Sequence, residues 1–312
     1  MGQSVRCLAD GKMKVLVTGS SGLIGSALVP ILSAEGHQVT RLVRPNTRPG
    51  PEQLVWDPAA GRLEAAGIEG FDAVAHLSGE NVASRRWTAE QKKRLFESRV
   101  KSTQLLAGTL ARLSHPPRTL VCASGVGYYG DRGDELLTED SASGSNFPSR
   151  MCREWEEAAE LATRNIRVVN LRIGAVLSAA GGALALMLPP FKAGLGGTLG
   201  SGRQYMSWIA IDDVTGVIQH VLSNESVSGP VNTVAPQPVT NREFTKTLGR
   251  VLGRPTFLTV PSFVLRLAVG EMAEALLLAS QRVIPARLQS SGYTFRYPEL
   301  EGALRHLLGK AA

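Results

Sequence analysis

The chain has 312 residues, of which 43% are hydrophobic, 20% are charged and 5% are aromatic, and its formal net charge is +7. This composition supplies a substantial core and indicates a globular protein, either one large domain with an appendage or two domains. The Lys and Arg residues are scattered, and no basic run is interleaved with aromatic residues, so the sequence argues against a nucleic-acid partner.

The three cysteines, Cys7, Cys122 and Cys152, have neither C-x-x-C spacing nor histidine partners. They predict no disulfide framework and no metal site, and they fit a reducing, cytoplasmic location. The first twelve residues contain no signal-type apolar core, and we expect a flexible tail before Met13. The most apolar stretch, residues 263–279, includes charged residues and is expected to form amphipathic helices rather than a membrane span.

A glycine-rich motif, KVLVTGSSGLIG, occupies residues 14–25. Its apolar run predicts a strand buried on both faces, and the apolar periodicity that follows predicts a helix. Glycines in the turn between them would let a pyrophosphate approach the free amides at the start of the helix. The motif favours a dinucleotide site over a simple tight turn, with cofactor contacts at Gly19, Ser20, Ser21, Gly22, Leu23, Ile24 and Gly25.

The end of the second predicted strand, residues 38–43, should face the ribose of the adenosine. An Asp or Glu at this place would bind a 2′-hydroxyl and repel a 2′-phosphate, whereas this chain has Arg44. Because a guanidinium pairs with a phosphate through two hydrogen bonds, Arg44 favours NADP over NAD. The alternative is a solvent-facing arginine at the start of the proline-rich loop over residues 45–51.

Strands and helices alternate along the rest of the chain, which predicts an α/β fold with a doubly wound parallel sheet, the NAD(P)-binding Rossmann fold. Further strands are expected at residues 54–56, 73–77, 119–123, 168–173 and 231–235, and helices at 88–113 and 214–222. We expect a Rossmann domain over residues 13–240, with substrate-facing insertions at 181–209, and a small C-terminal, substrate-facing helical region over residues 241–312.

Two polar features of these elements have structural interpretations. His76, at the end of a buried strand, is expected to be a hydrogen-bonded core residue. Asp212 and Asp213 precede the helix over residues 214–222, and we expect them to cap this helix and to interact favourably with its dipole.

Four motifs together resemble the extended short-chain dehydrogenase/reductase superfamily: TGSSGLIG at residues 18–25, HLSG at 76–79, ASGVGYYG at 123–130 and WIAIDDV at 208–214. The stretches LSGENV, CREWEEAA and GLGGTLGSGRQYMSWI are more narrowly similar to the atypical epimerase-family group termed 39U. Residues 281–304 resemble the C-terminal domain of unknown function of the same group, which would cover about residues 255–305 here.

The resemblance implies how a cofactor would be bound. Residues 19–25 would hold the pyrophosphate, and Arg44 would hold the 2′-phosphate. The adenine side would be contacted by Leu77, Ser78 and Gly79.

For the rest of the site the resemblance implies four further residues. Ser124 and Val176 would flank the nicotinamide half, and Glu80 would lie near the site without a defined role. Arg99 stands where extended members often have Asn. It would contact a phosphate or the ribose, or else lie on a helix surface.

The superfamily's Tyr-x-x-x-Lys pair is absent, because none of the five tyrosines has a lysine four residues later. In that pair the lysine lowers the pKa of the tyrosine, which passes the proton that accompanies hydride transfer. Counted back from the CREWEEAA stretch, the tyrosine position falls on Phe147 or Pro148 and the lysine position on Met151 or Cys152. The catalytic candidates that remain are Ser124, as a donor to a substrate oxygen, and Tyr128, for which a structural role is the alternative.

A substrate pocket is expected to have an apolar wall with one cation and one amide, formed by Met187, Arg203, Gln204 and Trp208. Met187 and Trp208 would alternatively belong to the core. Enzymes of the superfamily that act on nucleotide sugars usually have an arginine where this chain has Met206, so the sequence does not favour a sugar nucleotide.

The sequence thus predicts an NADP-dependent oxidoreductase or epimerase-like enzyme that acts on an unidentified small carbonyl or alcohol. The alternative is a non-catalytic NADP(H)-binding redox sensor or scaffold, which the absence of Tyr-x-x-x-Lys supports. The sequence is compatible with a homodimer.

Overall fold

The structure is a computed structural model that describes residues 11–45, 50 and 52–311. Cys7 and most of the expected tail over residues 1–12 lie outside these residues, as does most of the proline-rich loop over residues 45–51.

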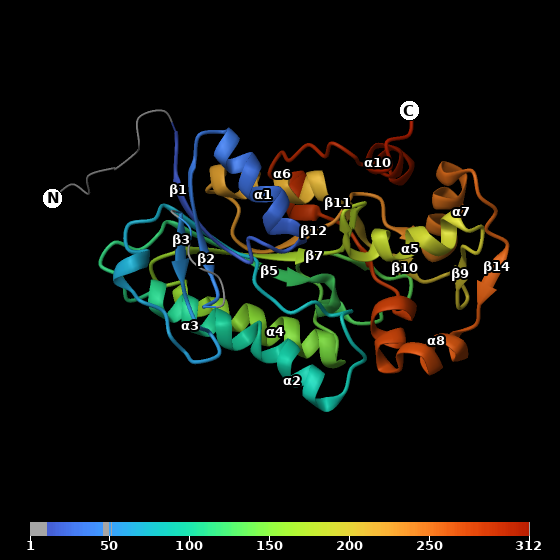
Figure 1. The fold of residues 1–312 in the computed structure, drawn as a ribbon, viewed down its shortest axis with the longest axis horizontal. Coiled ribbons are helices and arrows are strands. Elements are labelled where there is room, and N and C mark those ends of the chain that lie inside the picture. Colours follow the sequence, from blue (N-terminus) through green and yellow to red (C-terminus); the bar gives the residue numbers. More distant parts are fainter. Residues whose placement is uncertain (1–10, 46–49, 51, 312) are drawn as a thin grey trace.

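A parallel sheet forms the centre of the molecule (Figure 1) and has seven strands within the described ranges. Their spatial order is β12 (Gly229–Thr233), β7 (Arg167–Ile173), β5 (Thr119–Gly125), β4 (Ala73–His76), β1 (Lys14–Thr18), β2 (Gln38–Val43) and β3 (Gln53–Val55). Every adjacent pair is parallel, and the order steps outward from β1 in both directions, as in a doubly wound sheet. The predicted Rossmann fold is confirmed, although β12 begins and ends earlier than the strand predicted at residues 231–235.

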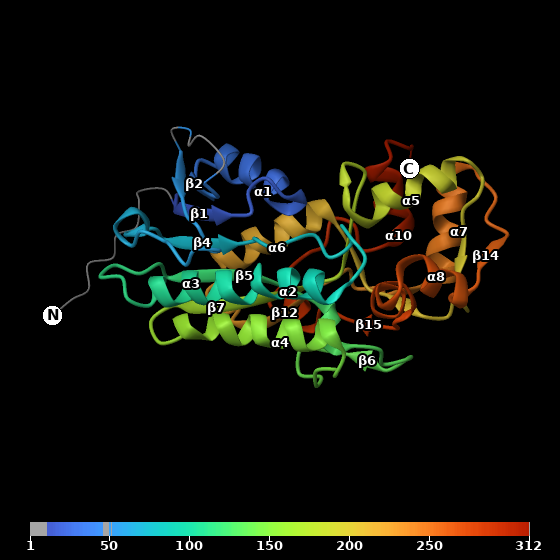
Figure 2. The ribbon, with the colours of Figure 1, turned by 60° about the horizontal axis from the view of Figure 1, so that its bottom comes forward.

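Helices cover both faces of the sheet (Figure 2). On one face lie α1 (Leu23–Ala34) and α6 (Ile211–Ser223), and on the other lie α3 (Val100–Leu110) and α4 (Phe147–Ala159). Side chains alternate between the faces along β1, since Val15 and Val17 pack with α1 and α6 whereas Leu16 packs with α3. Burial on both faces explains why the strand is a continuous apolar run.

The single helix predicted over residues 88–113 is wrong, because the structure has two helices there. After α2 (Ala89–Glu97) the chain breaks at Ser98 and Arg99 before α3 begins. The Arg99 N–H donates to the Phe96 carbonyl (3.1 Å) instead of continuing the ladder to Leu95. The Leu95 carbonyl accepts instead from the Ser98 hydroxyl (3.0 Å) and the Arg99 guanidinium (3.1 Å), and these side-chain donors stabilise the break.

A second lobe lies beyond the carboxyl ends of β5 and β7, toward which both strands point in Figure 1. In this lobe α5 (Gly182–Lys192), α7 (Asn241–Leu252) and α10 (Leu300–Leu307) pack around the buried Trp208. Short strands complete it and link it to the core: β8 (Ala175–Ser178) with β11 (Trp208–Ala210), β9 (Gly197–Leu199) with β14 (Leu258–Val260), β10 (Tyr205–Met206) with β13 (Val239–Thr240), and β6 (Leu136–Leu137) with β15 (Arg282–Val283).

Asp213 connects the two parts of the molecule. Its carboxylate is fully buried and accepts hydrogen bonds from the backbone N–H groups of Arg296 (2.7 Å) and Tyr297 (3.0 Å) and from the Tyr293 hydroxyl (3.1 Å). No side chain caps α6, whose N-cap is Ala210, so the expected capping role is wrong. Asp213 faces the C-terminal segment and satisfies its backbone donors there.

The C-terminal segment also docks onto the other face of the Rossmann core. After α8 (Ser262–Val269) the chain forms a π-helical turn, Ala273–Leu278. Just before this turn Glu271 pairs with Lys92 of α2, and Met272 packs in a cluster with Trp87 and Met151. These contacts join the two lobes beside the carboxyl edge of the sheet.

Candidate functional site

The glycine turn lies between β1 and α1, as the sequence predicts. Gly19 has a φ of +66°, and a Cβ there would lie 2.6 Å from the carbonyl carbon of Leu77. A Cβ at Gly25 would lie 2.3 Å from the Gly19 oxygen, whereas Gly22 has only that oxygen nearby, at 3.3 Å. The first and third glycines are therefore required by packing of the turn itself, in addition to any ligand.

The N-terminus of α1 is suited to an anion. Gly22 is its N-cap residue, no side chain makes a capping hydrogen bond, and no acidic residue lies in the first turn. The positive end of the helix dipole therefore meets no opposing carboxylate in the first turn. Backbone without a Cβ at Gly22, next to this helix end, fits the pyrophosphate of a dinucleotide.

Two predicted adenosine-side segments follow the strands on either side of β1. The Leu77 N–H donates to the Thr18 hydroxyl (3.1 Å), which places residues 77–79 beside Gly19. Arg44 is exposed just after β2, the neighbour of β1 on its other side. The carboxyl ends of β1, β2 and β4 thus meet at one edge, as the sequence argument requires.

Arg99 is neither on a helix surface nor free to move. It is buried, its guanidinium donates to the Glu80 carbonyl (2.8 Å), and it lies over the Trp155 ring at 5.2 Å. Glu80 in turn accepts a hydrogen bond from the Gln91 amide (2.9 Å). Burial lowers the pKa of Arg99, against the influence of Cys152 and Glu80. Both residues hold the 77–80 loop on α2 and α3, which corrects the helix-surface alternative.

Ser124 lies at the carboxyl end of β5 and is bonded to a buried ion pair. Its hydroxyl donates to Glu156 Oε1 (2.7 Å). Arg172 donates to the same carboxylate through Nε (2.9 Å) and Nη2 (2.8 Å). Burial acts to lower the pKa of Arg172, but the hydrogen bonds and charge of Glu156 outweigh burial and raise it, so the guanidinium stays charged.

The sequence argument missed Glu156 and Arg172. Arg172 interrupts the apolar run of β7, and Glu156 lies on the buried face of α4. A charge inside an element buried on both faces requires a partner, and this pattern could have identified the pair.

The two tyrosines of the GYYG motif have different surroundings. Tyr129 is fully buried, donates to Asn232 Oδ1 (2.6 Å) and accepts from Arg172 (3.0 Å), and burial raises its pKa to about 12. Tyr128 is half-buried, and the Arg172 guanidinium lies 3.5 Å from its ring centroid. The geometry thus fixes Tyr129 as a structural residue and places Tyr128 against the buried ion pair.

The positions of the usual Tyr-x-x-x-Lys pair hold no replacement acid or base. Phe147 and Pro148 form the start of α4, and Met151 and Cys152 are buried on it. The Cys152 sulfur lies near Gly125, and burial raises the pKa of this thiol to about 11.

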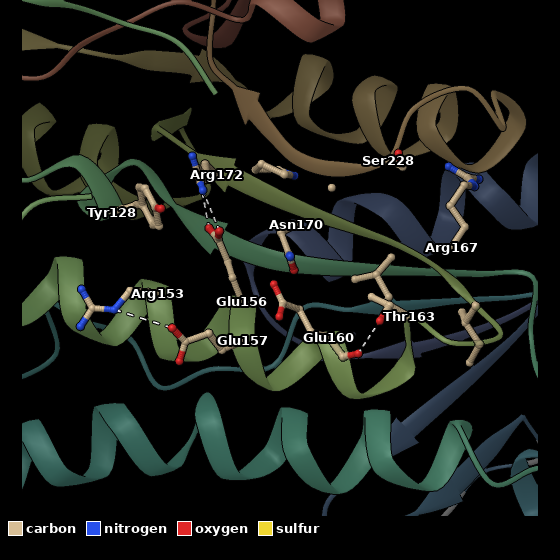
Figure 3. A pocket seen from close by; sticks show the side chains of 14 residues that line it. Tyr128, Arg153, Glu156, Glu157, Glu160, Thr163, Arg167, Asn170, Arg172 and Ser228 are labelled. Atoms are coloured by element: carbon tan, nitrogen blue, oxygen red, sulfur yellow. Dashed lines mark hydrogen bonds and ion pairs between the residues drawn. The ribbon is translucent and has the colours of Figure 1, made fainter. Parts of the chain in front are cut away.

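A groove of about 610 Å³ is lined by residues of α4, β7 and β12 (Figure 3). Its walls include Tyr128, Glu156, Glu160, Asn170 and Arg172. Figure 3 shows Asn170 pointing into this groove between Arg172 and Glu160. Asn170 Oδ1 is buried and accepts no hydrogen bond from any described residue. Glu156 therefore contacts Ser124 and also borders a polar, solvent-connected groove.

The expected substrate-pocket residues do not all line a pocket. Trp208 is fully buried, and its ring N–H donates to the Gln237 carbonyl (3.0 Å), so it belongs to the core. The Gln204 amide is buried and bridges the carbonyls of two segments. Arg203 is exposed, and Met187 packs against the core around Trp208.

Val176 is half-buried in β8, where it pairs with Ile209, and its place beside the nicotinamide half stays a prediction. His76 is fully buried, with its ring nitrogens 2.7 Å from the Thr18 hydroxyl and 2.8 Å from the Thr103 hydroxyl. It is the hydrogen-bonded core residue that the sequence predicts.

Two features are absent from the described part of the chain. It contains no cluster of three or more His, Cys, Asp or Glu residues arranged to hold a metal ion. None of the described helices combines the length and the apolar character needed to cross a membrane.

The sheet order and the glycine turn define a Rossmann-type dinucleotide-binding protein. The chain belongs to the NAD dependent epimerase/dehydratase family, whose model matches residues 15–234. A second family model, the Domain of unknown function (DUF1731), matches residues 260–307.

The comparisons with individual proteins agree with the resemblance found in the sequence. Epimerase family protein MT2273 of Mycobacterium tuberculosis is 43% identical over 291 residues, which are 93% of this chain and 96% of that protein. Human epimerase family protein SDR39U1 is 41% identical over 299 residues, which are 95% of this chain and 100% of that protein. The predicted membership of the 39U group and its C-terminal domain is confirmed.

Two solved structures extend the agreement to three dimensions. The crystal structure of human SDR39U1 (isoform 2) with NADPH has a TM-score of 0.89 at 40% identity, covering 96% of this chain and 100% of that chain. The crystal structure of the nucleoside-diphosphate sugar epimerase from Corynebacterium glutamicum has a TM-score of 0.79 at 38% identity, covering 96% of this chain and 58% of that chain.

Proposed function

We propose that this protein binds NADP(H) and is an oxidoreductase or epimerase-like enzyme acting on a small carbonyl or alcohol. Residues 19–25 would hold the pyrophosphate at the N-terminus of α1, and Arg44 would hold the 2′-phosphate. The NADPH in the human structure supports this choice of cofactor. When bound, the nicotinamide ring supplies or accepts a hydride.

The observation that carries the proposal is the position of Ser124 on a buried ion pair. Burying Arg172 and Glu156 costs desolvation energy, which well-packed apolar residues would avoid. The pair instead orients a hydroxyl at the carboxyl edge of the sheet, where ligands of such folds bind. Ser124 would therefore contact the oxygen of the substrate at the reacting carbon.

A second candidate function is a non-catalytic NADP(H)-binding sensor or scaffold. It is favoured by the residues at the tyrosine position (Phe147 or Pro148) and at the lysine position (Met151 or Cys152), which do not supply the usual acid/base pair. The two candidates share the cofactor and differ only in turnover.

A substrate panel separates the two candidates. Aldehydes, ketones, quinones, secondary alcohols and UDP-sugars are each incubated with NADPH or NADP. The reduced cofactor is followed by fluorescence, and the products are followed by NMR, because an epimerisation leaves the cofactor unchanged. Turnover of any compound supports the enzyme, whereas tight NADPH binding without turnover supports the sensor. In an active enzyme Ser124→Ala should lower kcat by about 100-fold or more while NADPH affinity is nearly unchanged. Ser223→Ala, on the exposed end of α6, is the control.

A further inference from the structure

Oxidation of an alcohol releases a proton as well as a hydride, and this chain lacks the tyrosine that usually receives that proton. The identity of the group that receives the proton matters only if the protein has the function proposed above. Two buried side chains interact with Ser124, the Cys152 thiol and the Glu156 carboxylate, and Glu156 Oε1 accepts the serine hydrogen bond at 2.7 Å.

The direction of the hydrogen bond between these two residues is informative. The Ser124 O–H donates to Glu156 Oε1 at 2.7 Å, so the lone pairs of Ser124 Oγ remain able to accept. An alcohol at the carboxyl edge of the sheet can then donate its own O–H to Ser124. The two hydrogen bonds would form a continuous path from substrate to carboxylate.

Arg172 fixes the carboxylate in this path. Its guanidinium is held by the Tyr129 hydroxyl (3.0 Å) and the Glu139 carbonyl (3.0 Å) as well as by Glu156. Only 4% of its side chain and 10% of the Glu156 side chain are exposed. The ion pair therefore holds the Glu156 carboxylate in one position beside Ser124.

The groove along α4 provides the way out. Glu156 borders it, and the unpartnered Asn170 Oδ1 points into it, as Figure 3 shows. A buried acceptor in a polar groove of this size is the kind of site that binds ordered water. Ser124, Glu156 and Asn170 thus lie along one route from the carboxyl edge of the sheet to the groove.

We propose that Glu156 is the proton relay of Ser124 and that the groove connects it to solvent. During oxidation the alcohol O–H bond breaks and its proton passes to Ser124 Oγ, while the Ser124 proton passes to Glu156 and then into the groove. The C–H bond breaks with its electron pair, which leaves as hydride to the oxidised cofactor, and a carbonyl forms. Reduction follows the same route in reverse.

Glu157 and Glu160 are exposed carboxylates in the groove wall, on the solvent side of Glu156, whereas the buried titratable and charged groups around Glu156 do not compete for this proton. Arg172 faces it from β7, Cys122 from β5 and Cys152 from its own helix. Burial raises the pKa of Cys152 to about 11 and that of Cys122 still further, so both stay protonated at neutral pH. Tyr128 and Tyr129 contact Arg172 rather than the carboxylate.

The test compares Glu156→Gln with Glu156→Asp and with Glu154→Gln, a control on the same helix. For each variant we would measure NADPH affinity by fluorescence, thermal unfolding, kcat and KM from pH 5 to 10, and proton release with an indicator dye. The alcohol is the one found in the panel above. We expect Glu156→Gln to lower kcat by about 100-fold or more and to flatten the pH profile, with KM and NADPH affinity within about twofold. Glu156→Asp should restore part of kcat, and Glu154→Gln should match the wild type.

A double variant, Glu156→Gln with Arg172→Gln, removes both charges and keeps the test valid if the single variant does not fold. The double variant should bind NADPH and should show the same flattened pH profile of kcat as Glu156→Gln. A wild-type pH profile in a folded Glu156→Gln or double variant would overturn the relay and leave the proposed function intact. A wild-type protein that turns over no compound would overturn both.

Discussion

Asp213, in the first turn of α6, accepts the backbone N–H of Tyr297, which lies 84 residues later in the chain. With the Arg296 N–H and the Tyr293 hydroxyl, this carboxylate satisfies three donors in a fully buried place. The last segment of the chain is therefore bonded directly to the Rossmann core.

Removing this carboxylate should destabilise the whole protein. We expect Asp213→Ala to lower the free energy of unfolding by about 3 kcal/mol, because it leaves buried backbone donors without acceptors. Asp212→Ala, which removes only a half-buried carboxylate near His306, should cost less than about 1 kcal/mol. Urea unfolding followed by circular dichroism would measure both, and equal losses would contradict the assignment.

The packing role of the first glycine gives a second prediction. Gly19→Ala places a Cβ against the Leu77 backbone at a φ of +66°, so it should abolish NADPH binding and lower the unfolding temperature. Gly61 has the same φ of +66° with nothing within 4 Å of a Cβ, so Gly61→Ala isolates the backbone strain, about 1 kcal/mol. If both variants lost the same amount of stability and of NADPH affinity, contact with the Leu77 backbone would not be the cause of these losses.

Arg44 should determine the choice between the two dinucleotides. Arg44→Asp replaces a phosphate partner with a repelling charge, and we expect NADPH affinity to fall by about 100-fold while NADH affinity changes little. Arg41→Asp, on the exposed side of β2, serves as the matched control. Fluorescence titration with both cofactors gives the ratio, and parallel losses would show that Arg44 does not read the 2′-phosphate.

His76 should make the protein sensitive to acid. Burial lowers its pKa to about 4 from an ordinary value of 6.5, so below pH 6.5 the unfolded chain binds a proton that the folded protein excludes. Stability is fully present above pH 6.5 and should fall by about 3 kcal/mol as the pH decreases to 4. Urea unfolding at several pH values in this range should give a free energy of unfolding that falls more steeply with decreasing pH for the wild type than for His76→Gln.

The sequence was sufficient to locate the main strands along the chain and the glycine turn, because both depend on local pattern. Apolar runs such as residues 15–17 identify buried strands, and the strand–glycine–helix succession identifies the turn. The break at Ser98 and Arg99 was not visible, since it depends on side-chain donors that take over the Leu95 carbonyl.

The candidate site was predictable only in part. Ser124 follows from its place after a strand, whereas its partners Glu156 and Arg172 come from two other elements and meet through packing. For Asp213 and Trp208 the local motifs predicted a role at the surface or in a pocket. The motif around Asp213 indicated a helix cap, and the motif around Trp208 indicated a pocket wall. Tertiary contacts assign both residues to the interior.

The link between Asp213 and residues 296–297 has a consequence for synthesis of the protein on the ribosome. The strand and helix that flank the glycine turn leave the exit tunnel early, but the Asp213 carboxylate on α6 stays without these donors until residues 296–297 emerge. The growing chain can therefore assemble most of the sheet before the C-terminal segment docks on α6.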